Sequence, residues 1–179
     1  MMRIIAGAAK GIPLAAAGHA TRPMTGRARE SLFSILGARC CDATVLDLYA
    51  GTGSLGLEAL SRGAADALFV ERDRVAARRL KDNIDAVGLG GVVRIGPVER
   101  VLTHLEQSFD LVFVDPPYAN DDASITDIVG SLRSVVVPGG LVVVHRRSRR
   151  GFDIPEFLTC IDQRRYGDAV VTMMERLES

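Results

Sequence analysis

The fold is decided by the stretch Val45-Leu46-Asp47-Leu48-Tyr49-Ala50-Gly51-Thr52-Gly53-Ser54-Leu55-Gly56-Leu57-Glu58. An apolar run ends in a glycine-rich turn, and apolar residues at helical spacing follow at once. Glycines let the backbone approach a ligand closely, and a helix N-terminus offers unpaired N–H groups. The stretch therefore predicts the strand, tight turn and helix of a nucleotide-binding βα unit.

The same stretch is compatible with a dinucleotide-binding fold. Gly51, Gly53 and Gly56 satisfy the pattern G-x-G-x-x-G, and Glu71 ends the apolar run that follows, twenty residues beyond Gly51. An acid at that place hydrogen-bonds the ribose of a bound dinucleotide. These residues alone leave a nucleotide-dependent oxidoreductase open.

A second stretch, Phe109 to Tyr118, favours another class of enzyme. Its apolar run ends in Asp115-Pro116-Pro117-Tyr118. In this order and at this separation, the two stretches resemble the S-adenosylmethionine-dependent methyltransferases that modify exocyclic amino groups of bases. The resemblance implies an α/β protein with the Rossmann-like class I methyltransferase fold and with S-adenosyl-L-methionine as cofactor. It also implies that Asp-Pro-Pro-aromatic forms the pocket for the target base.

The resemblance places the cofactor at the glycine turn and at the acid that ends the next strand. The turn is expected to hold the methionine part, and Glu71 to accept hydrogen bonds from the ribose hydroxyls. A carboxylate suits this task because it accepts two charge-assisted hydrogen bonds at once. Gly96 and Pro97 stand where many such enzymes have an Asp or Asn for the adenine, so that contact stays open. The predicted cofactor-binding residues are Asp47, Tyr49, Ala50, Gly51, Gly53, Glu71 and Arg72.

The predicted catalytic residues are Asp115, Pro116, Pro117 and Tyr118. An exocyclic base amine is a poor nucleophile because its lone pair is delocalised into the ring. Hydrogen bonds from the amine to a carboxylate and a backbone carbonyl can turn this lone pair toward the methyl group, so positioning supplies most of the rate gain. The two prolines fix φ and remove N–H groups, and Tyr118 offers a face on which an extruded base can stack.

Strand and helix patterns alternate from Thr44 onward, which is typical of a parallel sheet covered on both faces. Pro138-Gly139-Gly140 interrupts the last long apolar run and places its strand at 141–144. The tail, residues 158–177, is typical of a hairpin. The resemblance implies a seven-stranded, mostly parallel sheet with an antiparallel last strand inserted beside the fifth. Strands are expected at 44–49, 67–71, 92–95, 110–114 and 135–144, and helices at about 54–62, 73–87, 98–106 and 123–133.

Residues 1–41 are predicted to form an extension packed on a methyltransferase domain of residues 42–179. Short strands are expected at 3–7 and 10–14, followed by a helix over 25–36 with Thr25 as N-cap and Gly37 as its stop. The segments 3–14 and 22–36 resemble the bacterial methyltransferases that act on a guanine N2 of 16S ribosomal RNA. That group usually has Thr where Met24 stands and Asp where Gly26 stands. The resemblance covers nearly the whole chain and implies 16S rRNA as partner, free or within the small ribosomal subunit.

The net charge of the chain is zero, but its distribution is uneven. Residues 1–41 carry +5 and residues 42–179 carry −5, which indicates a basic module on an enzyme body. We expect the extension to lie near the cleft at the carboxyl edge of the sheet, where ligands of open α/β sheets bind. The predicted RNA-binding residues are Arg3, Lys10, Arg22, Arg27 and Arg29.

Other features argue against metal, membrane and secreted classes. The three cysteines form no metal-ligand spacing with the histidines, and their odd count favours reduced thiols in a cytoplasmic protein. No apolar run is long enough for a signal peptide or a membrane span. His145 is interpreted as a strand-end histidine, and the four arginines between 146 and 150 as a phosphate site or a solvated loop. A DNA adenine-N6 or cytosine-N4 methyltransferase is the alternative within the enzyme class, although such enzymes generally carry an added recognition domain.

Overall fold

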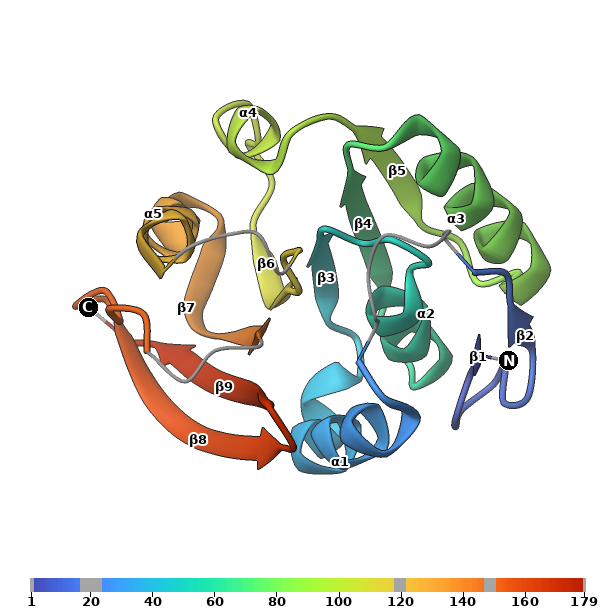
Figure 1. The fold of residues 1–179 in the computed structure, drawn as a ribbon, viewed down its shortest axis with the longest axis horizontal. Coiled ribbons are helices and arrows are strands. Elements are labelled where there is room, and N and C mark those ends of the chain that lie inside the picture. The colour runs from blue at the N-terminus through green and yellow to red at the C-terminus, as the bar shows by residue number, and fades with distance from the viewer. Residues whose placement is uncertain (1, 17–23, 118–121, 147–150, 179) are drawn as a thin grey trace.

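The computed structural model describes residues 2–16, 24–117, 122–146 and 151–178. Seven strands form one sheet in the order β5-β4-β3-β6-β7-β9-β8 (Figure 1). Their bounds are β3 (Thr44–Leu48), β4 (Asp66–Glu71), β5 (Val92–Ile95), β6 (Phe109–Val114), β7 (Val136–Arg146), β8 (Leu158–Tyr166) and β9 (Ala169–Arg176). Strands β3 to β7 are parallel, and β9 runs antiparallel between β7 and β8. The predicted architecture, including the antiparallel last strand beside the fifth, is confirmed.

Helices cover both faces of the sheet, and each face has its own apolar cluster. The first cluster lies under α1, α2 and α3, where the rings of Phe33 and Phe113 pack with their centroids 5.7 Å apart. The second lies under α4 and α5 and contains Val112, Val114 and Ile128. The helices are α1 (Gly26–Leu36), α2 (Ser54–Ser61), α3 (Arg74–Val87), α4 (Val98–Leu102) and α5 (Asp122–Ser131), with short 3-10 turns at Gly37–Cys40 and Leu132–Ser134.

The ends of the two longest helices follow from their flanking residues. The side chain of Thr25 accepts a hydrogen bond from the N–H of Ala28 at 3.2 Å, and Asp73 caps α3 in the same way. Such side chains satisfy donors that the first helical turn leaves free. Gly37 ends α1 with φ 51°, and Gly88 ends α3 with φ 69°. The predicted cap and stop of α1 are confirmed.

The amino-terminal strands are shorter than predicted, with β1 at Met2–Arg3 and β2 at Pro13–Leu14. One reason is that, beyond the bonds between Ile4 and residues 11–12, four backbone donors of this segment bond to α2. The N–H groups of Ile5 and Ala6 donate to the Glu58 carboxylate at 2.7 and 3.1 Å. Those of Ala8 and Ala9 donate to the carbonyl and hydroxyl oxygens of Ser61.

The late valine-rich run also differs from the prediction, because β7 continues through Pro138-Gly139-Gly140. Pairing with β6 joins Phe109 to Val136 and resumes at Leu111 with Leu141, so the intervening residues form an irregularity in β7. Pro138 has no N–H to donate, and Gly139 has a φ of 73°. The strand therefore bulges here but does not end. Among the described residues, no helix has both the length and the apolar character needed to span a bilayer.

Candidate functional site

The carboxyl ends of three neighbouring strands bring the predicted cofactor and base residues to one edge of the sheet. In the parallel registers, Leu48 at the end of β3 pairs with Val70 of β4 and with Val114 of β6. The residues that follow are the glycine turn, Glu71 and Asp115. Ligands of open α/β sheets bind at this edge, so the arrangement is that of a ligand site.

The three glycines of the turn are required for different structural reasons. A Cβ on Gly53 would lie 2.4 Å from a side-chain carbon of Leu80, and one on Gly56 would lie 2.4 Å from the ring of Phe69. These two positions therefore serve the close packing of α2 and α3 on the sheet. A Cβ on Gly51 would meet only the carbonyl oxygen of Tyr49, at 3.9 Å. The backbone at Gly51 thus faces open space into which a ligand can approach.

Tyr49 itself has a φ of 60°, which is uncommon for an aromatic residue and marks local backbone strain. Such strain persists where the surrounding structure fixes it, and it clusters at ligand sites. Ala50 helps to fix the turn, because its N–H donates to the carbonyl of Val70 at 3.0 Å.

Glu71 lies in a position suited to a ribose. Its carboxylate accepts hydrogen bonds from the N–H of Gly51 at 2.9 Å and from the N–H of Asp73 at 2.8 Å. One bond reaches each oxygen, so each keeps a lone pair for a further donor. The side chain is half-buried, which leaves it accessible at the edge of the sheet. These residues fit a nucleoside cofactor whose ribose hydroxyls bond to Glu71. Arg72 follows with its side chain exposed.

Asp47 has a supporting position beneath the turn, at 1% exposure. One carboxylate oxygen accepts the N–H of Gly56 at 2.9 Å, which ties the first turn of α2 to β3. Burial raises the pKa of the Asp47 carboxyl well above its ordinary value, and the nearby charges of Asp115 and Glu71 raise it further, while the Gly56 N–H opposes the shift. Asp47 therefore holds the turn in place, and its predicted contact with the cofactor stays a prediction.

Asp115 follows β6 with its side chain half-buried. Its N–H points to the carbonyl of Leu48 at 3.5 Å, and one carboxylate oxygen lies 2.7 Å from Nδ1 of His145. Pro116 is buried and Pro117 is half-buried, so the turn is anchored against the protein. Tyr118 lies outside the described residues, and its predicted stacking role stays a prediction.

Sequence reasoning missed His145 as a member of this site. The residue is 4% exposed and lies at the end of β7, next to the end of β6. The strand register could have revealed it. Val114 pairs with Val144 in the parallel register, so Asp115 and His145, which follow them, become neighbours. That register depends on the bulge at Pro138 to Gly140, which the sequence does not specify.

The predicted RNA-binding residues fall into three groups. Arg3, Lys10 and Arg27 are exposed, and Arg22 lies outside the described residues. Arg29 is 2% exposed and donates to the carbonyl of Arg3, and its predicted contact with RNA stays a prediction. Burial lowers the pKa of the Arg29 guanidinium, while the negative charge of Glu58 raises it. Arg29 therefore joins α1 to the amino-terminal segment of residues 2–16, called the arm below.

Lys10 also differs from the expected placement near the carboxyl edge. Its turn, between Gly7 and Gly11, lies against Ser61 at the last residue of α2. Because α2 begins at the glycine turn, its last residue points toward the opposite edge of the sheet. Met2 at the base of the arm lies nearer the site, with its sulfur 3.6 Å from the Thr52 hydroxyl. The opposite end of the arm is also near the turn, because Asn83 bonds both the backbone of Ala15 and the carbonyl of Thr52.

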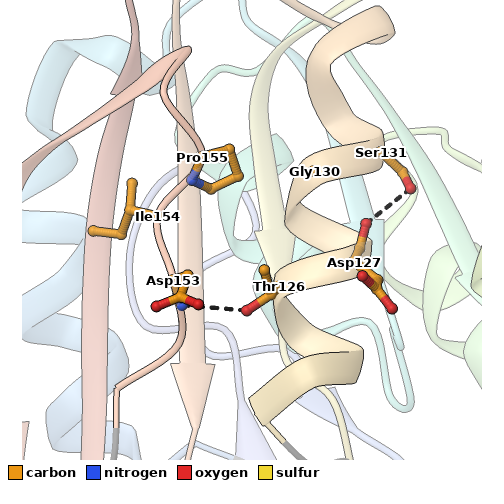
Figure 2. Close-up of a pocket in the computed structure, with 7 residues that line it drawn as sticks. All are labelled: Thr126, Asp127, Gly130, Ser131, Asp153, Ile154 and Pro155. Carbon is orange, nitrogen blue, oxygen red and sulfur yellow. Dashed lines mark hydrogen bonds between the residues drawn. The ribbon is translucent and has the colours of Figure 1, made fainter.

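A separate groove of about 550 Å³ lies between α5 and the segment that follows β7 (Figure 2). The N–H of Asp153 donates to the Thr126 hydroxyl at 3.2 Å, and Ser131 donates to the carbonyl of Asp127 at 2.9 Å. None of the predicted site residues that the structure describes lines this groove. Nearby, Arg146 forms an ion pair with Asp122, and Arg147, Arg149 and Arg150 lie outside the described residues.

Known proteins resemble this chain over most of its length. "Ribosomal RNA small subunit methyltransferase D" from Haemophilus influenzae is 31% identical over 172 residues, covering 93% of this chain and 89% of that protein. The protein of the same name from Escherichia coli (strain K12) is 41% identical over 100 residues, about half of each chain. The solved structure of a hypothetical protein from Thermus thermophilus superposes with a TM-score of 0.84 at 34% identity, with both chains fully covered. A family model described as "Conserved hypothetical protein 95" matches residues 2–175, and the chain belongs to that family.

Proposed function

We propose that the protein transfers a methyl group from S-adenosyl-L-methionine to the exocyclic N2 amine of a guanine in 16S ribosomal RNA. The observation that carries the proposal is the meeting of the glycine turn, Glu71 and Asp115-Pro116 at adjacent strand ends. The family relatives are named as methyltransferases of small-subunit ribosomal RNA, which supports the RNA substrate. The guanine N2 specificity rests on the resemblance of the segments 3–14 and 22–36 to enzymes of that type.

The cofactor is held by the glycine turn and Glu71. The open space above Gly51 admits the methionine part, and the free lone pairs of Glu71 accept the ribose hydroxyls. When bound, S-adenosyl-L-methionine supplies a methyl group already activated by its sulfonium. The protein therefore needs only to bind and orient the two substrates and to exclude water, without a separate activating group.

The base is positioned by Asp115 and the proline turn. The Asp115 carboxylate can accept an N–H of the exocyclic amine, which orients the nitrogen lone pair away from the ring. Because Pro116 is buried, the turn that carries the carboxylate has little freedom to move. The carboxylate is also the group nearest to receive the proton that the amine loses on methylation.

The experiment that tests the function measures transfer of a radiolabelled methyl group to 16S rRNA, free and within small ribosomal subunits, followed by nucleoside analysis. The expected product is N2-methylguanosine. Asp115→Ala should reduce the single-turnover rate by about 10²-fold or more, while cofactor affinity changes little. Label in N6-methyladenine or N4-methylcytosine of DNA would instead establish the alternative amino-methyltransferase, and a fully active Asp115→Ala enzyme would contradict the assigned role.

Glu71 provides a separate prediction for the cofactor. Glu71→Ala should weaken S-adenosyl-L-methionine binding by about 1–3 kcal/mol, because the ribose hydroxyls lose a charged acceptor. Isothermal titration calorimetry measures the change directly. Asp82→Ala, which removes an exposed carboxylate from α3, is the matched control and should bind as the wild type does. Unchanged affinity in a folded Glu71→Ala protein would place the ribose elsewhere.

A further inference from the structure

His145 and Asp115 form a pair at the end of two adjacent strands. The parallel register of β6 and β7 places Val114 beside Val144, so the next residues of both strands are level with each other. Nδ1 of His145 lies 2.7 Å from a carboxylate oxygen of Asp115, at the distance of a charge-assisted hydrogen bond. The two side chains lie on the face of the sheet that carries Phe113 and Val143.

The surroundings of His145 offer few hydrogen-bond partners for its ring nitrogens. The imidazole is buried, and β9 on its other side pairs it with the apolar Val171. Leu141, Val143 and Val171 belong to the apolar cluster beneath it. A buried polar ring requires a hydrogen-bond partner, and Asp115 supplies one. The Asp115 carboxylate can only accept, so Nδ1 must carry the proton in this bond.

We propose that His145 is a positioning residue that fixes the Asp115 carboxylate for the base amine. The inference rests on the proposed function and names a residue for it outside the Asp-Pro-Pro-Tyr motif. The hydrogen bond to one oxygen fixes the plane of the carboxylate. The second oxygen then points to the position of the target amine without having to rotate into place. Since the backbone of Asp115 is already fixed by Pro116, the bond from His145 settles the remaining freedom of the side chain.

Two variants separate positioning from packing. His145→Leu keeps an apolar side chain of similar bulk but donates no hydrogen bond. His145→Asn places an amide nitrogen at the same distance from Cβ as Nδ1 and can donate to Asp115. A displacement of about 1 Å in a reacting group lowers a rate by about 10²-fold. The expected result is therefore a 10- to 100-fold lower kcat for His145→Leu, with the KM for RNA and the cofactor Kd within about 2-fold of the wild type.

His145→Asn should recover most of the rate that His145→Leu loses. The difference in rate between the two variants should not follow from a difference in their melting temperatures. In an Asp115→Ala background, His145→Leu should cause no further loss, because residues that act through one another are not additive. A folded His145→Leu enzyme with wild-type kcat would overturn the proposal. Equal losses in the Leu and Asn variants that follow their melting temperatures would also overturn it, since they would show a packing role.

Nuclear magnetic resonance tests the pair without any catalytic assay. In the 15N-labelled protein, a proton on Nδ1 of His145 should give a downfield, slowly exchanging signal that His145→Asn removes and Asp115→Ala shifts. Absence of the signal would overturn the pairing even in an active enzyme. If instead the wild-type protein shows the signal but methylates no RNA, the proposed function fails while the pair stands.

Discussion

At the scale of single residues, the buried Asp47 carboxyl links the stability of the glycine turn to pH. Its pKa in the folded protein is raised, chiefly by burial, above the ordinary value of 3.8. The unfolded chain therefore holds fewer protons at this group between the two pKa values. Its contribution to stability is full below the unfolded pKa and is lost as the pH rises through the folded pKa.

Asp47→Asn tests this linkage. The amide oxygen can still accept the Gly56 N–H, but no charge has to be buried. The free energy of unfolding of the variant, relative to the wild type, should therefore increase as the pH rises above about 4. Urea titrations at several pH values between 4 and 8 measure this, with Asp82→Asn as a control for loss of a surface charge. A relative stability that is flat or falls with pH would contradict the raised pKa.

The single residues also show what the sequence could predict and where it failed. The positions of Glu71 and Asp115 at adjacent strand ends were predictable, because each ends an apolar run in the sequence. His145 and Arg29 were not, because their roles depend on partners distant in the chain. A helix-surface arginine becomes buried here only because the arm carries its carbonyl acceptor, at Arg3, over α1. Periodicity within α1 contains no information on that contact.

At the scale of elements, the docking of the arm on α2 depends on Gly7. This residue has φ 86°, and a Cβ on it would lie 1.7 Å from the carbonyl oxygen of Ser61, a backbone atom that cannot yield easily. Gly11, in the same turn, has φ 88° but open space around a Cβ. The two positions therefore carry similar backbone strain and differ in the clash.

Gly7→Ala and Gly11→Ala form a matched pair of variants. Gly11→Ala should destabilise the protein by about 1–2 kcal/mol, because a left-handed conformation is unfavourable for alanine. Gly7→Ala should cost at least about 1 kcal/mol more, because the arm must also move from α2 and lose the bond from Ala8 to Ser61. Chemical denaturation measures both. Equal losses in the two variants would show that the arm does not depend on this close approach.

The elements themselves were largely predictable, and the exceptions have physical causes. The helix ends depend on local hydrogen bonds and φ values, so they can be predicted from nearby residues. These residues are Thr25, Gly37, Asp73 and Gly88. The bulge that carries β7 across Pro138 depends on β6 remaining paired on both sides of it. Local propensity predicts a break there, and the cooperative pairing of the sheet overrides it.

At the scale of the whole molecule, a chain of zero net charge must attract RNA through a local basic surface. Arg3 is exposed on the arm, and Arg27 is exposed on α1, where it lines a groove with Arg164 of β8. Lys10 lies by the last residue of α2. We propose that the exposed side chains of Arg3 and Arg27 each contact the RNA backbone. Arg22 lies outside the described residues, and its predicted RNA contact stays a prediction.

Replacing Arg3 and Arg27 together by alanine should flatten the dependence of log affinity on log salt by about one to two units, because fewer counterions are released. Filter binding or fluorescence anisotropy over a range of salt concentrations measures the slope. Lys10→Ala is the control, and it should retain the wild-type slope. The double variant should still bind the cofactor normally. A larger effect of Lys10→Ala on the slope would contradict the proposal and would place the RNA at the carboxyl end of α2.

The docking of the arm has a consequence for how proteins of this family can diverge. Ile4 and Leu14 of the arm share one apolar cluster with Val45 of the central strand, and Glu58, which is fully buried, holds the arm's backbone. An extension joined in this way is not a module that can be exchanged by recombination. Consider a chimera that takes residues 1–41 from a relative. It should fold only if α2 of the recipient protein supplies the hydrogen-bond acceptors that the relative's arm requires. Changes in RNA preference are therefore expected to arise by point substitution on the exposed side of the arm, while its buried side remains committed to the core.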